Sequence, residues 1–441
     1  MDHHLLSRIQ SRDFVVGIIG MGYVGLPLAV AFGAANFKVL AFDIDDEKTT
    51  ALNEGRSYIN HIGNERIAEM RKHGRFEATS HFERLDEPDA LLICVPTPLT
   101  RHHEPDLRYV VDTTEAIASR LRPNQIVILE STTYPGTTLE VMKPLLERKG
   151  LRAGVDFFIA YSPEREDPGN IDHSTARIPK VVGADDERSL AIALELYGTV
   201  VPKTVPVSST ATAEAVKITE NVFRAVNIAL VNELKVVFDA MGIDIWEVIE
   251  AAKTKPFGYM PFYPGPGLGG HCIPIDPFYL TWKAREYNQH TRFIELAGQI
   301  NSDMPWHVVR VLSDALDARF SKGLNGARVL ILGLAYKKNV DDTRESPALR
   351  LIDLLEARGC STDYFDPHAP EIPKVREYPA LVGRKSVAWD PAQLASYDAA
   401  LIATDHDGVD YKLLADVAKL VIDTRNACAR AGANMARVVR A

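Results

Sequence analysis

The sequence has few cysteines, no long apolar run and no excess of positive charge. Its four cysteines are widely scattered and form no CxxC pair, which argues against a disulfide framework and a zinc site. The 13 histidines show no metal-binding spacing, so we expect no metal. No apolar run could span a membrane, and the start, MDHHLLSRIQSRDF, lacks the apolar core of a signal peptide. A net charge of −9 disfavours nucleic acid as the main partner. The cytoplasm is therefore the expected compartment.

The length indicates several domains, because 441 residues are too many for one hydrophobic core. Composition is that of a soluble globular protein, with 46% hydrophobic and 25% charged residues. The patterns described below predict an α/β fold, with two Rossmann-like parallel-sheet domains joined by a helical domain that contains one long helix. The expected boundaries are 1–206, 207–320 and 321–441.

The stretch FVVGIIGMGYVGLPLAVAFGAANFKVLAFDIDD predicts a strand over 14–19, a glycine turn, a helix to about residue 35 and a strand over 38–42. Gly20, Gly22 and Gly25 follow the G-x-G-x-x-G pattern between strand and helix, which indicates a dinucleotide site. Gly22 allows the backbone to approach a pyrophosphate, whose charge the helix N-terminus stabilises. Asp43 ends the second strand and can accept hydrogen bonds from a ribose, but it repels a 2′-phosphate. We therefore expect NAD rather than NADP; the alternative is a Rossmann-like domain without a cofactor.

Three further buried strands end in polar residues. DALLICVPTPL, QIVILESTTYPGTT and FFIAYSPEREDPGN place Thr97, Thr132 and Glu164 at strand ends. Ligands of open parallel sheets lie beyond the carboxyl ends of the strands, so these residues are site candidates. Cys94 lies inside its strand and is expected to serve packing.

One long helix is predicted over about 210–241, stopped by Gly242. Lys217 and Asn221 lie four residues apart on it and share a face, either as a solvated pair or as functional groups. Its apolar stripe consists of Val216, Phe223, Val226, Leu230, Leu234 and Val237. Shorter helices follow, and the helical region continues to about residue 319.

The segment PGPGLGGHCIPIDP interrupts these helices and contains Cys272. It matches neither a periodic helix nor an alternating strand, and its glycines and prolines predict a stiff, shaped loop. Two interpretations of Cys272 are open at this point: a buried small hydrophobe, or a nucleophile beside a substrate.

A third region begins near residue 325 and again predicts strand, turn, helix and strand, with Asp366 at the end. Its turn has only Gly333, followed by Tyr336, Lys337 and Lys338. The triple-glycine pattern is absent, so we expect no second NAD; a basic loop at a strand end suits an anion such as a diphosphate.

An NAD site combined with a nucleophilic cysteine suggests a specific chemistry. An alcohol is oxidised to an aldehyde, a thiolate adds to it, a second hydride leaves, and water hydrolyses the thioester to an acid. Such a reaction requires an activated thiol, a base and an oxyanion donor. Cys272, Glu164, and Lys217 with Asn221 have these chemical types.

The chain resembles the UDP-glucose/GDP-mannose dehydrogenase family along nearly its whole length. The matching motifs are GMGYVGLPLA, VPTP, ESTTYPG, SPER, AEAVKITEN, GLGGHCIPIDP and AYKKNVDDTRESP. The resemblance implies a four-electron oxidation at C6 of a UDP-sugar, with Cys272 as nucleophile, Glu164 as acid/base of the thioester step, and a homodimer built on the long helix. It also implies that Lys217 and Asn221 stabilise the oxyanion and that Asp276, with Thr132, orients a water. Cofactor contacts are implied for Gly20, Gly22, Tyr23, Val24, Gly25, Asp43, Lys48, Pro96, Thr97, Thr132 and Arg344. Substrate contacts are implied for Glu164, Arg165, Lys217, Asn221, Tyr263, Gly265, Gly267, Gly269, Tyr336 and Lys337.

Within this family, the chain looks most similar to UDP-N-acetylglucosamine 6-dehydrogenases. SPEREDPGN, TDHD and the residues around the cysteine loop carry this match, and Ile275 and Pro168 depart from the UDP-glucose branch. No second catalytic glutamate is therefore transferred. His271 either tunes the thiol, or it only fills the loop or contacts the substrate. UDP-glucose and UDP-N-acetylgalactosamine are alternative substrates. A two-electron β-hydroxyacid-type dehydrogenase and a non-catalytic NAD-binding protein are alternative functions.

Overall fold

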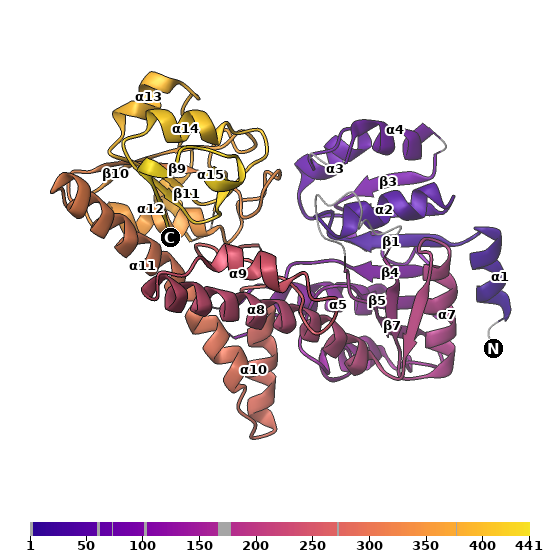
Figure 1. Cartoon of the computed structure of the whole chain (residues 1–441). Helices are drawn as coiled ribbons and strands as arrows, with labels where there is room; N and C mark the ends of the chain where they lie inside the picture. Colours follow the sequence, from indigo (N-terminus) through magenta and orange to yellow (C-terminus); the bar gives the residue numbers. More distant parts are fainter. Residues whose placement is uncertain are drawn as a thin grey trace. The chain divides into compact units, whose positions relative to one another are not determined.

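The computed structural model describes residues 3–59, 62–72, 74–100, 104–165, 178–270, 273–375 and 377–441. The chain forms two compact units. The first contains Met1–Glu220 and Phe278–His290, and the second contains Asn221–Pro277 and Thr291–Ala441. Each unit is built around one sheet of mostly parallel strands with helices on both faces, as Figure 1 shows.

The sheet of the first unit has the strand order β3-β2-β1-β4-β5-β6-β7-β8. All neighbouring strands are parallel except β6 and β7, which are antiparallel. The order reverses between β1 and β4, so a crevice for ligands is expected beyond the ends of these two strands. The strands are β1 Val15–Ile19, β2 Lys38–Phe42, β3 Phe76–Thr79, β4 Ala90–Ile93, β5 Ile126–Leu129, β6 Phe158–Tyr161, β7 Lys180–Gly183 and β8 Thr204–Val207.

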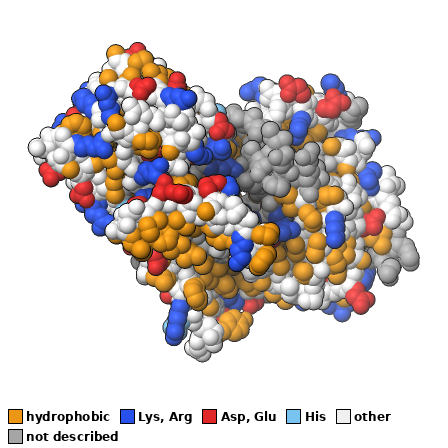
Figure 2. Space-filling view, viewed as in Figure 1, with side chains coloured by type: hydrophobic (Ala, Val, Ile, Leu, Met, Phe, Trp, Pro, Cys, Tyr) orange, Lys and Arg blue, Asp and Glu red, His pale blue; other side chains and the backbone are white. Residues whose placement is uncertain are grey.

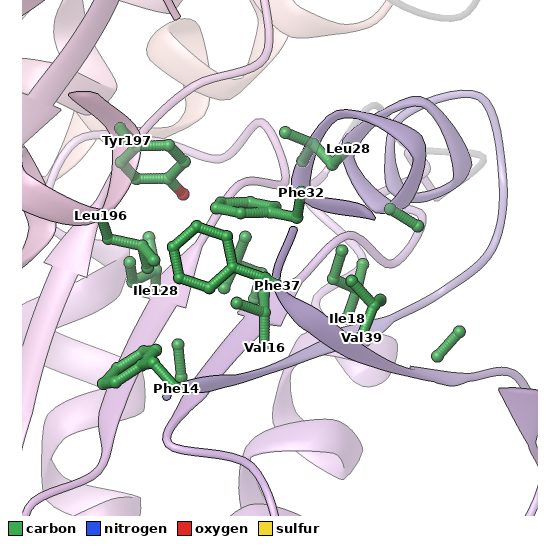
Figure 3. Packing of buried hydrophobic residues seen from close by; sticks show 14 of the residues in the cluster. Phe14, Val16, Ile18, Leu28, Phe32, Phe37, Val39, Ile128, Leu196 and Tyr197 are labelled. Atoms are coloured by element: carbon green, nitrogen blue, oxygen red, sulfur yellow. The ribbon is translucent and has the colours of Figure 1, made fainter. Parts of the chain in front are cut away.

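Alternating strand residues form two hydrophobic layers. One layer packs against α1, α2, α4 and α7, and the other packs against α5 and α6. In the first layer, Phe32 of α2 meets Phe37 edge to face with ring centroids 5.7 Å apart, and Tyr197 of α7 lies beside them (Figure 3). The helices are α1 His3–Ser11, α2 Gly25–Ala34, α3 Asp46–Asn53, α4 Asn64–Lys72, α5 Arg108–Arg120, α6 Lys143–Leu146 and α7 Glu187–Gly198.

The helical region begins with α8, Thr210–Ala240, which belongs to the second unit from Asn221 onward. It is followed by α9 Ile245–Ala252, α10 Asp276–Glu286 and α11 Arg292–Phe320. The predicted apolar stripe of α8 does not form its buried face. Phe223, Leu230 and Val237 are 50, 53 and 45% exposed, whereas smaller residues such as Ala225 and Ala229 are buried.

The sheet of the second unit is parallel throughout, with the order β10-β9-β11-β12-β13. Helices α11 and α12 cover one face, and α13, α14 and α15 cover the other. The strands are β9 Arg328–Leu332, β10 Ser361–Phe365, β11 Ala399–Ile402, β12 Val421–Asp423 and β13 Val438–Arg440. The helices are α12 Pro347–Glu356, α13 Pro391–Ser396, α14 Tyr411–Val417 and α15 Ala427–Arg430.

The predicted fold class is thus confirmed: two Rossmann-like sheets and a long central helix. Strand β2 has the predicted bounds, and α8 ends one residue earlier than predicted. In the described part of the chain, no helix is both long and apolar enough to cross a membrane.

Candidate active site

The glycine turn after β1 leaves room for a pyrophosphate. Gly20 has a φ of +94°, and a Cβ there would lie 2.7 Å from the carbonyl oxygen of Cys94. A Cβ at Gly25 would lie 2.0 Å from the carbonyl oxygen of Gly20, so only glycine permits this tight start of α2. In contrast, nothing lies within 4 Å of a Cβ built at Gly22. The turn therefore fits the pyrophosphate of NAD at the N-terminus of α2.

The Asp43 carboxylate is fixed beside this turn at the end of β2. Its Oδ2 accepts a hydrogen bond from the backbone N–H of Met21 at 2.8 Å, and its Oδ1 accepts one from Asp45 N–H at 3.0 Å. The Lys48 ammonium lies 3.5 Å from Oδ2. Because Asp43 is only 6% exposed, it keeps one position, as a residue that selects between ribose and ribose phosphate must do.

The ends of β4 and β5 present the predicted threonines at the same sheet edge. Thr97 is buried, and its carbonyl oxygen accepts a hydrogen bond from the Tyr279 hydroxyl. Thr132 is half-buried, and the hydroxyl of its neighbour Ser131 donates to the carbonyl oxygen of Val95 at 2.7 Å. Three further predicted cofactor residues follow the ends of β1 and β4: Tyr23, Val24 and Pro96.

Glu164, Arg165 and Lys217 meet where β6 ends. The Lys217 ammonium of α8 donates to the carbonyl oxygen of Glu164 at 2.6 Å. Glu164 Oε1 accepts from the backbone N–H of Arg165 at 2.7 Å. The Arg165 guanidinium pairs with Glu220 of α8, with Nη2 and Oε1 2.6 Å apart. The first unit thus brings the Lys217 ammonium to the backbone of Glu164, although the two residues are distant in the sequence.

In the second unit, Asn221 forms a buried pair with Asp276. The amide Nδ2 of Asn221 donates to Asp276 Oδ2 at 2.6 Å, and the two residues are 4 and 2% exposed. Asp276 is the first residue of α10, directly after the cysteine loop. Cys272 and His271 lie outside the described residues. A buried polar pair therefore flanks the segment that contains the predicted nucleophile.

The glycines of the cysteine loop allow it to contact the turn after β9. Gly265 N–H donates to Asn232 Oδ1 at 3.0 Å, and Gly270 N–H donates to the carbonyl oxygen of Arg344 at 3.1 Å. A Cβ at Gly269 would lie 2.7 Å from Cβ of Tyr336, and Gly267 has a φ of +135°. Side chains at these glycines would separate the loop from the turn.

Three predicted site residues belong to the turn after β9: Tyr336 and Lys337, predicted to contact the substrate, and Arg344, predicted to contact the cofactor; the predicted substrate residue Tyr263 precedes the cysteine loop. The Lys337 ammonium lies 5.8 Å from the ring centroid of Tyr336. The Arg344 guanidinium pairs with Asp342, with Nη2 and Oδ2 2.6 Å apart. Tyr263 stacks on Trp246 with ring centroids 5.6 Å apart, and its hydroxyl donates to Glu250.

Sequence reasoning missed a cation beside the loop. Arg425 follows β12, and a Cβ at Gly265 would lie 2.4 Å from its Nη1. The position of Arg425 directly after a buried strand of the second sheet was the available signal.

It also missed Glu214, which is buried on α8. Its Oε1 accepts from the N–H of Thr138 at 2.9 Å, and Oε2 accepts from Gly136 N–H, which fixes the loop that follows Thr132. Burial raises the pKa of Glu214 to about 7.

Throughout the described ranges, no three His, Cys, Asp or Glu side chains are grouped so that they could hold a metal ion.

Comparison with known protein families gives three matches, all to one family. Residues 14–201 match the NAD binding domain of the UDP-glucose/GDP-mannose dehydrogenase family, residues 211–303 its central domain, and residues 330–430 its UDP binding domain.

Individual relatives agree with these matches. The chain is 38% identical over 369 residues to the UDP-N-acetyl-D-glucosamine 6-dehydrogenase of Pseudomonas aeruginosa, which covers 83% of this chain and 86% of the relative. It is 37% identical to Protein CapL of Staphylococcus aureus, with 89% of each chain covered. The structure of the UDP-D-ManNAc dehydrogenase from Pyrococcus horikoshii superposes with a TM-score of 0.84 at 34% identity, covering 94% of this chain and 96% of that one.

Proposed function

Because the chain belongs to the UDP-glucose/GDP-mannose dehydrogenase family, and is an NAD-dependent UDP-sugar dehydrogenase, we propose that it oxidises UDP-N-acetyl-D-glucosamine at C6 to the uronic acid. Conversion of an alcohol to an acid removes four electrons, so each sugar consumes two NAD⁺ and one water. NAD⁺ supplies the hydride acceptor for both oxidations.

The Cys272 thiolate adds to the C6 aldehyde, and the resulting oxyanion is stabilised by Lys217 and Asn221. Loss of the second hydride leaves a thioester, which water hydrolyses with Glu164 as the base. Asp276, with Thr132, orients the water of the first oxidation. The observation that carries this proposal is the environment of the cysteine loop: Asn221 and Asp276 at its end, and Arg425 and Tyr336 against its glycines.

The mechanism is tested by NADH yield and by intact-protein mass. The wild type should form two NADH per sugar, whereas Cys272→Ser should form no acid. Glu164→Gln should accumulate a thioester on Cys272 after mixing with substrate and NAD⁺. Cys360→Ser, at a buried cysteine whose Sγ donates to Leu324, is the matched control and should turn over normally. One NADH per sugar, or an adduct on another residue, contradicts the mechanism.

The choice of sugar is supported by the similarity to the Pseudomonas aeruginosa enzyme and by the segments around Glu164 and Cys272. An acetamido group requires partners for its N–H and carbonyl, since an unpaired buried amide costs about 1–3 kcal/mol. Other relatives are named UDP-N-acetyl-D-mannosamine dehydrogenase, so this epimer is the second candidate. A panel of UDP-N-acetylglucosamine, its mannose and galactose epimers and UDP-glucose, with product mass as the readout, decides between them. A higher kcat/KM for any other sugar refutes the choice.

We also propose that a second copy of the chain covers the outward face of α8. Phe223, Leu230 and Val237 repeat every seventh residue and are each about half exposed, with Met241 63% exposed beyond them. Figure 2 shows hydrophobic side chains gathered around α8 and α9. A seven-residue apolar repeat on a helix is the pattern that packs against a second helix, and a two-fold axis would pair this face with itself.

A further inference from the structure

A buried lysine lies behind Glu164, and the mechanism above does not use it. Lys180 opens β7, and its side chain is 4% exposed. Its ammonium donates to Glu130 Oε2 at 2.8 Å and to the carbonyl oxygen of Pro163 at 3.3 Å, and it lies 3.7 Å from Glu164 Oε2. One ammonium therefore contacts two carboxylates and also the backbone directly before Glu164.

Glu130 is the interior member of this group. It follows β5, its side chain is fully buried, and its second carboxylate oxygen accepts a hydrogen bond from the Tyr197 hydroxyl. Tyr197 belongs to the core layer of α7 shown in Figure 3. Burial raises the pKa of Glu130 to about 6, although the charge of Lys180 opposes this rise.

The arrangement differs from an ordinary buried ion pair, in which one cation neutralises one anion. Lys180 lies between an interior carboxylate and Glu164, whose side chain is 13% exposed. Two carboxylates this close to each other would compete for a proton if no cation lay between them. The Lys180 ammonium lies near both carboxylates and offsets the repulsion between them.

We propose that Lys180 is a positioning residue that keeps the Glu164 carboxylate ionised and oriented for thioester hydrolysis. The negative charge of Glu130 weakens this effect of Lys180 on Glu164. This proposal rests on the proposed function, in which Glu164 is the base. As the water oxygen bonds to the thioester carbon, Glu164 takes its proton; the C–S bond then breaks, and the thiolate leaves with the electron pair and recovers the proton. Only an ionised carboxylate can accept that proton.

The groups that face this cluster come from several elements. Cys94 after β4 and Tyr197 of α7 are near Lys180 and Glu130. Lys217 of α8 contacts the Glu164 backbone, and the Arg165 guanidinium is engaged by Glu220. Within this set, Lys180 is the cation whose ammonium approaches the Glu164 carboxylate from the interior.

The test is the pH dependence of thioester hydrolysis, followed by quenching and intact-protein mass. Lys180→Met should raise the pH of half-maximal hydrolysis by about one to three units, the effect of a cation within about 4–6 Å on a carboxyl. Glu130→Gln removes the competing carboxylate and should lower the pH of half-maximal hydrolysis. Lys180→Arg keeps the charge and should restore the wild-type profile. The NADH burst that precedes hydrolysis reports, in the same reaction, that each variant is folded and binds both ligands.

Lys283→Met is the matched control. Lys283 is also 4% exposed in the first unit, but its ammonium pairs with Glu140 and Glu286. This variant should leave the hydrolysis profile unmoved. The inference is overturned if the Lys180→Met profile coincides with that of the wild type, or if Lys180→Met and Glu130→Gln shift it in the same direction. Failure of the proposed function is a different result, because the wild type itself would then form no thioester.

Discussion

Replacing Asp43 by asparagine should make the enzyme accept NADP⁺, and the size of the effect follows from the structure. A ribose 2′-phosphate carries more than one negative charge and would lie about 4 Å from the carboxylate that binds the ribose. Two unit charges at that distance repel by about 1 kcal/mol in water and about 4 kcal/mol at an effective dielectric of 20. Since Asp43 is 6% exposed, an intermediate penalty of about 3 kcal/mol applies, which is about 100-fold in kcat/KM.

Lys48 adds a second contribution. Its ammonium lies 3.5 Å from Asp43 Oδ2 and is released when that charge is removed, so that it can pair with the phosphate. Asparagine has only one acceptor oxygen for the N–H groups of Met21 and Asp45, and absolute activity with both cofactors should fall. The measured quantity is therefore the ratio of kcat/KM for NADP⁺ to that for NAD⁺.

This ratio should rise about 100-fold in Asp43→Asn and fall back in Asp43→Asn combined with Lys48→Ala. Asp46→Asn removes an equal charge from an exposed neighbour and should change the ratio less than about threefold, because solvent screens it. An unchanged ratio in Asp43→Asn would refute the role given to this carboxylate. An equal ratio with and without Lys48 would refute the role of the lysine.

Three other substitutions test separate parts of the molecule. The folded state keeps a proton on Glu214 that the unfolded chain releases above about pH 4.5, so the free energy of unfolding should fall by about 3 kcal/mol between pH 4.5 and 7. Thermal melts of Glu214→Gln should lack this part of the pH dependence. If the stability of Glu214→Gln changed with pH as steeply as that of the wild type, the role given to Glu214 would be contradicted. Leu230→Glu should convert the dimer to monomer in sedimentation velocity, and a monomeric wild type would contradict the proposed dimer face. Asn232→Leu removes the acceptor of Gly265 N–H and the donor to the side-chain oxygen Oδ1 of Asn301, so thioester formation should slow at unchanged KM for NAD⁺. An unchanged burst would show that the loop does not depend on this amide.

The parts of the fold that could be predicted from the sequence are those that depend on residues close together in the chain. The strand over 38–42 and the turn at Gly20–Gly25 follow from local apolar runs and glycine spacing, and the structure has them as predicted. The end of α8 follows from Gly242, which has a φ of +71° and can end the helix in the left-handed region. The short helix α1 was not predicted, because its amphipathic pattern covers little more than two turns.

The apolar stripe of α8 shows a limit of periodicity. The repeat through Phe223, Leu230 and Val237 is real, but a period does not say what covers an apolar face. In the structure, α8 buries residues of other faces, such as Ile218, Ala225 and Ala229, and it exposes Phe223, Leu230 and Val237. A single chain cannot distinguish a core face from a face between subunits by spacing alone.

Charge pairs were the least predictable feature, because their partners are far apart in the chain. Lys217 contacts the backbone of Glu164, Asn221 contacts Asp276, and Lys180 contacts Glu130, each pair separated by at least 50 residues. Lys180 at the start of β7 looks like a solvated strand end in the sequence, because its buried partner Glu130 follows β5, which lies two strands away in the sheet.

The two sheets have an aspartate at the same position, and a hydrogen-bond partner that is distant in the sequence gives one of these aspartates a different role. Asp43 and Asp366 each end the strand next to the first strand of their sheet, and each accepts hydrogen bonds from the backbone of the adjacent glycine turn. Asp366 is also bonded to His406 Nε2 at 3.0 Å, while His406 Nδ1 accepts from Asn339 N–H, so that this carboxylate is enclosed by its own turn. Burial opposes ionisation of Asp366, but these hydrogen bonds outweigh it and lower its pKa to about 2. In the second sheet, the carboxylate therefore holds the turn that carries Tyr336 and Lys337 in place, whereas in the first sheet it remains beside an open turn that fits a ribose and a pyrophosphate.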